Sequence, residues 1–448
     1  MGWLDRILNR TPAAPTVQTR RFDGAAGGRR GFGTGNFWRI NPEIAAAGPQ
    51  LRARARYLAA NNALISNGVA NLATALVGAG INAAPRHPDA DVRKQVMAIW
   101  NEWTERADAD RRGDFYALQA QIARGLIVDG EAFAQIVHTD AGPTLRLLPP
   151  EQIDESKTIE LPGGAMIVSG VEFDSSGQRV AYWVFPSRPT ATFDSYAHSV
   201  RVPADEILHI MQPLAVGQVR GVTWLANVIL PASEFDQLCD ALLVGVKTSA
   251  MFAGFLTNVN GAGEDPFDGE DVPSLEPGSL MRLGLGYDVK FSAPQQAQQT
   301  SEFLKAQIRQ LAAGLGVPSH WLDGDLSGAN FSSLRAGLLP VRARCEQTQY
   351  HVLVPQLLNP IWAEVMGWAA LSGDLPGYED APADYRADWL PSAWQQVDPQ
   401  KQINADIAEL EAGLTSRRKL VAQRGWSLED LDVELAAEKP LEQKDSKG

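Results

Sequence analysis

The sequence of 448 residues contains only two cysteines and no long hydrophobic run. Cys239 and Cys345 each fall within a helical apolar pattern, so a disulfide framework is disfavoured. The longest uninterrupted apolar stretch, Ala241 to Val246 with its glycine, is far shorter than the roughly 18 residues that a membrane span needs. The beginning, MGWLDRILNR, lacks a signal-peptide core, and Arg6 breaks the myristoylation pattern. We therefore expect no membrane partner and production in a cytoplasm.

Lysine is absent from the first 60 residues, where ten arginines accompany three acids. That segment carries a charge of +7 and the remainder −20, for a net charge of −13. This asymmetry predicts a basic arm that contacts an anionic partner and an acidic body that does not bind phosphate tightly. A solvated tail without a partner is the alternative interpretation of the arm. Its candidate contact residues are Arg20, Arg21, Arg29 and Arg30.

The usual sequence signatures of enzymes are missing. There is no GxxxxGK[ST] phosphate loop, no GxSxG elbow, no HExxH and no CxxC. His209, with Asp205 and Glu206 nearby, could belong to a hydrolase site, but no nucleophile turn accompanies it. The acids at 264–271 could bind calcium, but they miss the spacing of an EF-hand loop. We expect no catalytic residue, metal or cofactor; the alternative is a cytoplasmic hydrolase or metal-dependent enzyme with a dispersed site.

The sequence of the first half predicts an arm followed by a mixed α+β unit. Residues 1–50 are rich in Arg, Gly and Pro, which predicts an extended arm. From Leu51 the apolar spacing indicates one long helix that ends at Gly78 and Gly80, and a second helix follows from Phe115. Between Glu131 and Ile210, short apolar runs separated by turn residues predict a small antiparallel β unit.

The second half predicts long helices around two loops. A helical pattern runs over 224–252, where Pro231 should kink or restart it, and a second ends near Pro318. Strand-like segments flank the acidic loop between them. A Gly- and Asp-containing loop follows, and then a helical pattern interrupted by Pro340, Pro355 and Pro360. Two or three short helices close the chain, with Gly413 as a stop and a capping box at Ser427.

Several motifs in this order resemble the lambda family of tailed-bacteriophage portal proteins. They are LLPPEQID, LANVILPASEFDQLCDALLVGVKTSAMFAGFLTN, LEPGS, SEFLKAQIRQLAAGLGVPSHWLDGDLSGANFSSLRAG and DPQKQINADIAELEAGLTSRRKLVAQRG. The resemblance covers nearly the whole chain after residue 50. It implies a portal-protein fold that assembles into a ring, usually of twelve copies, at one capsid vertex. The genome is packaged and later ejected through such a ring.

The resemblance also implies a division of the chain into named parts. These are an arm (1–50), a wing (51–223), a first stem helix (224–252), a β-containing clip (253–292), a second stem helix (293–318), a tunnel loop (319–332), a wing spine helix with the following segment (333–397), and a helical crown with the tail (398–448). The chain is short for the family, so the crown should be reduced.

The implied partners are other copies of the chain, the terminase large subunit, head–tail adaptor or neck proteins, the major capsid and scaffold proteins, and double-stranded DNA. The DNA should be bound weakly and without sequence specificity, because a conduit must let a duplex slide. The implied location is the portal vertex of the virion, with host cytoplasm during assembly. The tunnel-lining candidates are His320, Trp321, Asp323, Gly324, Asp325, Ser327, Gly328 and Asn330. The partner-binding candidates in the clip are Glu264, Asp265, Asp268, Glu270 and Asp271.

Overall fold

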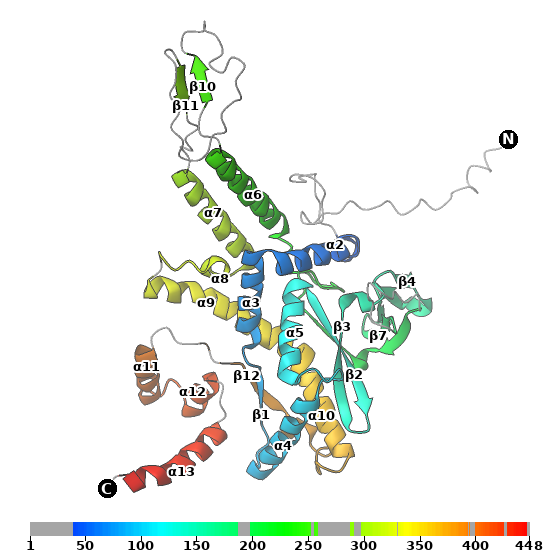
Figure 1. Cartoon of the computed structure of the whole chain (residues 1–448). Helices are drawn as coiled ribbons and strands as arrows, with labels where there is room; N and C mark the ends of the chain where they lie inside the picture. Colours follow the sequence, from blue (N-terminus) through cyan, green and yellow to red (C-terminus); the bar gives the residue numbers. More distant parts are fainter. Residues whose placement is uncertain are drawn as a thin grey trace, which may run out of the picture.

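The computed structural model shows a mixed α+β body from which one pair of helices projects (Figure 1). The structure describes residues 39–186, 198–251, 255–258, 287–290, 297–328, 330–392, 394, 399–424 and 428–445.

Two helices, and not one, form the start of the body. Helix α2 spans Ile40–Asn61 and helix α3 spans Ala63–Val77. The break lies at Asn62, whose side chain accepts the Ile65 N–H at 2.8 Å and so caps α3. The prediction of one continuous helix from Leu51 is therefore wrong. The extended arm was also predicted too long, because residues 40–50 belong to α2 and pack in the core.

The small antiparallel β unit predicted from Glu131 is confirmed, and it consists of two sheets. The first has the order β3 (Gly142–Leu148), β2 (Glu131–Thr139), β9 (Ile207–Met211). The second has the order β4 (Ile159–Glu160), β5 (Met166–Val168), β6 (Val171–Phe173), β7 (Arg179–Val184), β8 (Val200–Pro203). All the strand pairs within these two sheets are antiparallel.

An aromatic cluster joins distant parts of the chain beneath the sheets. Trp100 of α4 (Ala90–Arg106) contacts Phe115 of α5 (Phe115–Val128), with ring centroids 5.4 Å apart. The same indole contacts Trp362 at 4.8 Å and Trp389 at 5.8 Å, both from the C-terminal third. Trp389 lies on β12 (Ala387–Leu390), which pairs with β1 (Asn82–Pro85). These contacts hold the first and last parts of the body together.

Helices α6 (Ile229–Met251) and α7 (Ala297–Leu315) project from the body as a pair, with a short hairpin at the far end (Figure 1). The hairpin pairs β10 (Phe255–Asn258) with β11 (Tyr287–Lys290), which confirms the strand-like segments that flank the acidic loop. Pro231 lies in the first turn of α6, where a missing N–H costs nothing, so it restarts the helix as predicted.

A long helical rod follows the loop after α7, and its prolines do not interrupt it. It consists of α9 (Phe331–Thr348), the π-helix η5 (Gln349–Leu358) and α10 (Asn359–Leu371). Pro340 lies inside α9, Pro355 lies inside the π-helix, and Pro360 takes the first turn of α10. The wider π-helical turns explain how Pro355 is accommodated, because they relieve the clash of the ring with the preceding turn. The predicted interruption is therefore wrong.

Three helices close the chain, as expected: α11 (Pro399–Glu411), α12 (Arg417–Gln423) and α13 (Leu428–Asp445). Gly413 has a φ of 69° and follows the end of α11, as a helix stop should. The predicted capping residue Ser427 lies outside the described residues. Within the described parts of the chain, no helix is both long and apolar enough to cross a membrane.

Candidate functional site

The segment between α7 and α9 begins with a short helix that is anchored to the body. Helix α8 spans His320–Asp323, and Gly324 ends it with a φ of 70°. Leu322 is buried in the main core, and Trp321 packs against that core. Asn67 and Asn71 of α3 donate their side-chain amides to the carbonyls of Leu322 and Trp321, at 3.0 and 2.8 Å. The first part of the predicted tunnel loop is therefore fixed.

The remainder of that loop is exposed. Residues 323–328 and Asn330 all face solvent, and Leu326 is among the exposed large apolar side chains. Asp323 and Asp325 each accept the backbone N–H two residues later, at 2.9 Å in both cases, which makes two successive turns. Asn330 then caps α9 through a reciprocal pair of hydrogen bonds with Ser333. The structure thus brings the expected loop residues together on one short acidic turn.

Two arginines near this loop hold helices together. Arg344 donates to the Leu315 carbonyl at 2.6 Å and lies over the Trp224 ring, so it joins α9 to the end of α7. Arg342 pairs with Glu346 one turn along α9, at 2.9 Å. These two arginines therefore stabilise the helices within one copy of the chain. The acidic clip candidates and the arm arginines Arg20, Arg21, Arg29 and Arg30 lie outside the described residues.

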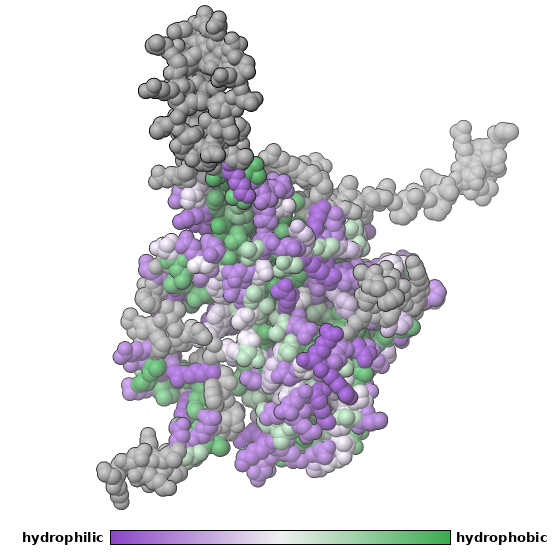
Figure 2. Space-filling view, viewed as in Figure 1, coloured by the Kyte–Doolittle hydropathy of each residue, from purple (hydrophilic) through white to green (hydrophobic). Residues whose placement is uncertain are grey.

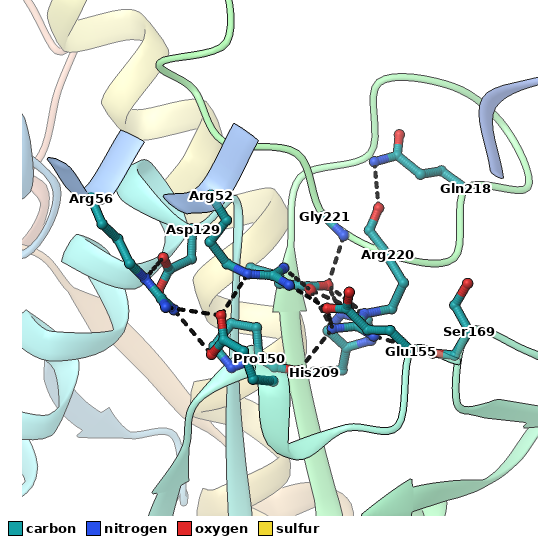
Figure 3. Close-up of polar contacts among 12 residues, drawn as sticks. Arg52, Arg56, Asp129, Pro150, Glu155, Ser169, His209, Gln218, Arg220 and Gly221 are labelled. Atoms are coloured by element: carbon teal, nitrogen blue, oxygen red, sulfur yellow. Dashed lines mark hydrogen bonds and ion pairs between the residues drawn. The ribbon is translucent and has the colours of Figure 1, made fainter. Parts of the chain in front are cut away.

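A second site is a buried network of charged side chains next to α2 (Figure 3). Glu131 of β2, whose side chain is 0% exposed, forms an ion pair with Arg220 at 2.7 Å. Arg220 also donates to the Ser169 and Pro150 carbonyls, both at 3.1 Å. The backbone N–H of Gly221 donates to Glu131 Oε2 at 2.7 Å. Protein donors therefore take the place of water around the Glu131 carboxylate, as a buried charge requires.

Two arginines of α2 extend this network toward the surface. Arg52 is buried and bonds Glu151 at 2.8 Å as well as Glu155. Arg56 is more exposed and pairs with Asp129 at 2.6 Å and with Glu151 at 2.8 Å. Three guanidinium groups therefore meet four carboxylates. The network ties α2, the start of β2, the segment after β3 and the chain that leads into α6 to one another.

Close backbone packing makes two glycines necessary here. A side chain at Gly221 would lie 2.3 Å from the Gly130 carbonyl oxygen, and one at Gly130 would lie 2.0 Å from the backbone of Val222. Gly130 also has a φ of 87°, which favours glycine. The absence of both side chains lets the Gly221 N–H reach Glu131.

His209 of β9 is part of this network and is not a catalytic base. Its ring is stacked on Phe133 with centroids 4.2 Å apart, and its side chain is 1% exposed. Its Nε2 lies 3.1 Å from Glu131 Oε2, and its Nδ1 lies 3.3 Å from the Tyr182 hydroxyl. Because an ionised carboxylate only accepts, the neutral imidazole donates from Nε2 and accepts at Nδ1. Both nitrogens are engaged, so the hydrolase interpretation of His209, Asp205 and Glu206 has no geometric support.

Burial and the neighbouring charges shift the pKa values of this pair downward. Burial, which outweighs the ion pair with Glu131, lowers the pKa of His209 to about 4. Burial would raise the pKa of Glu131, but Arg220 and His209 hold it well below its ordinary value. The folded chain therefore binds fewer protons at these groups than the unfolded chain does.

We expect the stability of the body to fall as the pH decreases from about 6.5 to 4. His209 has an ordinary pKa of 6.5 and a folded value of about 4, which corresponds to about 3 kcal/mol lost over this window. Urea unfolding at several pH values measures the effect. His209→Gln, which does not titrate, should flatten this pH dependence. An equally steep decrease in that variant would show that other groups cause it.

Sequence reasoning missed Glu131 and Arg220. One signal was present, since Glu131 begins a strand of mostly apolar residues, EAFAQIV, directly after Asp129 and Gly130. A charge at the start of a buried strand requires a partner. The partner lies 89 residues away, so the sequence does not indicate which arginine it is. Among the described residues, no group of three or more His, Cys, Asp or Glu side chains could hold a metal ion.

Comparison with known proteins identifies the family of this chain. The family described as "Phage portal protein, lambda family" matches residues 36–349, which is well over half of the sequence. The chain belongs to the lambda family of phage portal proteins. Portal proteins are structural components of the virion that connect head and tail, so the chain is a head–tail connector and not an enzyme. The enzyme alternative is thereby set aside.

Similarity to individual portal proteins extends beyond the matched region. The chain is 26% identical over 369 residues to the probable portal protein of Halomonas phage phiHAP-1, which covers 78% of this chain and 70% of that one. It is 22% identical over 498 residues to portal protein B of Escherichia phage lambda, with coverage of 94% and 92%.

Two solved structures are similar to this chain at low TM-scores. One is the neck of an empty gene transfer agent particle, at a TM-score of 0.48 and 16% identity, covering 86% of this chain and 94% of that chain. Another is an HK97-family portal protein from Corynebacterium diphtheriae, at a TM-score of 0.33 and 13% identity, with coverage of 79% and 98%. These TM-scores are below 0.5, so the family membership rests on the sequence match alone.

Proposed function

We propose that copies of this portal protein, twelve in the simplest case, form a ring through which the genome enters and leaves the capsid. The family match supports this proposal. So does the pair α6 and α7, which carries large apolar side chains on exposed faces: Leu243, Val244, Val246 and Phe303. Figure 2 shows apolar surface along the projecting pair. Exposed apolar faces of this extent are typical of subunit contacts.

In this proposal, α6 and α7 are the stem helices, and β10 with β11 belongs to the clip that contacts the terminase large subunit and later the neck or adaptor proteins. The helices α9, η5 and α10 are the wing spine, and α11–α13 are the crown. The exposed turn at 323–330 faces the channel, where Asp323 and Asp325 repel the phosphate backbone and let the duplex slide. The arm contacts scaffold, major capsid protein or DNA, and assembly takes place in the host cytoplasm.

Electron microscopy of the purified protein tests the ring. We expect top views with rotational symmetry and a central hole wide enough for a duplex of about 20 Å. Moderate salt should be used, because surface charge pairs are screened there and the apolar contacts remain. Monomers or dimers at every concentration tested would contradict autonomous ring formation.

A further inference from the structure

The three C-terminal helices form an apolar groove that the described part of the chain leaves open. The groove measures about 560 Å³. It is lined by Ile403, Ile407 and Leu410 of α11, Leu420 and Val421 of α12, and Leu431 and Leu435 of α13. Figure 2 shows apolar side chains on α11 and α12 with hydrophilic residues around them. Ile403, Ile407 and Leu410 are spaced as one helix face, and all three are exposed.

Two ion pairs hold the groove in shape without closing it. Arg417 of α12 bonds Asp432 of α13 at 2.6 Å, and Arg424 bonds Asp406 of α11 at 3.0 Å. These pairs fix α12 against both of its neighbours at the rim. The apolar lining of the groove between the two ion pairs remains exposed, so another apolar surface can bind there.

Helix α13 presents a second apolar surface on its opposite face. Leu431 and Leu435 point into the groove, four residues apart. Val433 lies between them in sequence, so it points to the other side of the helix, about 200° away at 100° per residue. Its side chain is 65% exposed. The small residues Ala436 and Ala437 follow at the three- and four-residue spacing, also exposed, so this face is a narrow ridge that another surface can approach closely.

The charges beside the groove and the ridge are opposite in sign. Residues 416–424, which contain α12, carry four basic side chains and no acid. Helix α13 carries seven acids and two lysines. Arg418 lies three residues before Val421 of the groove, and Glu434 lies three residues before Ala437 of the ridge, so each flanks its surface at helical spacing. Both side chains are exposed and form no ion pair with another described residue. A ridge from one copy would thus bring acids to the bases beside the groove of another.

We propose that the α13 ridge of one copy, centred on Val433, inserts into the α11–α13 groove of the next copy. Groove and ridge lie on different faces of the same three helices. The contact is therefore head-to-tail: each copy inserts its ridge into one neighbour and accepts the ridge of the other neighbour in its groove. Contacts of this kind close into rings when the rotation permits. The proposal rests on the proposed ring and specifies one surface through which neighbouring subunits recognise each other.

Cross-linking between two single variants tests the contact. Leu410→Cys places a thiol in the groove and Val433→Cys places one on the ridge, both in a background with Cys239→Ser and Cys345→Ala. We expect co-expression of the two variants to give a cross-linked dimer with a short bis-maleimide, and either variant alone to give none. A dimer from Val433→Cys alone would indicate a two-fold contact and overturn the proposal.

Charge exchange provides a second readout. Arg418→Glu should lower the guanidinium concentration at which rings dissociate, and combining it with Glu434→Lys should restore that concentration. Ala437→Asp, on the ridge beside Val433, should abolish the cross-link, whereas Leu414→Asp should not, since Leu414 is 77% exposed but belongs to neither surface. The double charge reversal without any rescue would contradict the pairing.

Electron microscopy of the same samples separates this proposal from the ring itself. Rings without the Leu410–Val433 cross-link would overturn the contact and leave the portal function standing. The absence of rings in the parent protein would contradict both this contact and autonomous ring formation. Cross-linking of Leu410→Cys to residues 1–38 through a maleimide-linked photoreactive group, identified by mass spectrometry, would assign the groove to the N-terminal arm and refute a second copy as its occupant.

Discussion

Replacing Glu131 with glutamine is expected to destabilise the body by about 3–5 kcal/mol, because it removes the charge that compensates a buried arginine. Glu131 is fully buried, and Arg220 is almost as deeply buried beside it at 2.7 Å. The amide of Glu131→Gln would also point one N–H₂ donor at groups that need an acceptor. The midpoint of urea unfolding at pH 7.5, followed by tryptophan fluorescence, measures the loss.

A matched control is Asp388→Asn, which also converts a carboxylate to an amide beside an arginine. Asp388 pairs with Arg86 across β12 and β1, and both side chains are more than 40% exposed. An exposed pair of this kind contributes at most about 1 kcal/mol. Equal stability of Glu131→Gln and the parent protein would mean that the buried network does not hold the body together.

The same network predicts an effect on α6. Arg220 and Gly221 lie a few residues before that helix, and Thr223 and Trp224 bond the end of α5 through the Ile127 carbonyl. Loss of Glu131 should therefore loosen the base of the projecting pair. Rings of Glu131→Gln should show weaker density for α6 and α7 than for the rest of the body.

Removing residues 325–328 is expected to leave ring assembly intact and to abolish stable retention of packaged DNA, because the shortened turn would no longer narrow the proposed channel around the duplex. These four residues are exposed. Within the described chain they form one ion pair, between Asp325 and Lys305 at 3.6 Å, and it is solvent-exposed. The deletion therefore removes little folding energy. Prohead assembly followed by nuclease protection of the packaged genome measures the outcome.

Leu322→Ala is the control that separates the turn from its anchor. Leu322 is buried against Leu315 and Gly68, so its truncation should cost about 2–5 kcal/mol while the acidic turn is unchanged. A deletion that began at Leu322 would confuse these two effects. Failure of the 325–328 deletion to form rings, with normal rings for Leu322→Ala, would show that the turn itself is an assembly element.

Periodicity predicted most helices well because their burial is one-sided. Phe115, Leu118, Ile122 and Leu126 face the core on α5, as their spacing predicted. It failed where a local cap or an unusual turn competes with the pattern. At Asn62 one side chain ends one helix and starts the next, and at Pro355 a π-helical segment accepts a residue that an α-helix would not. Neither event changes the apolar spacing around it.

The loop was correctly located but only partly described from its composition. Its glycines and aspartates indicated a connection between helices, and the exposed residues 323–328 and 330 agree with that expectation. The anchoring of Trp321 and Leu322 does not follow from the local sequence, because it depends on Asn67 and Asn71, about 250 residues earlier. Their amides reach α8 only after α3 has packed against it.

The sequence by itself determined the α+β class, the order of the helices and strands, and the portal family, because these follow from local spacing and from motifs in a fixed order. Only the tertiary structure decided which charges pair, since Glu131, Arg220, His209 and Arg52 come from four separate segments and meet in one buried place. The same holds for the groove and ridge of α11–α13. Apolar spacing in the sequence predicts that a helix has an apolar face. Only the packing of the helices shows whether that face is buried within the chain or remains exposed.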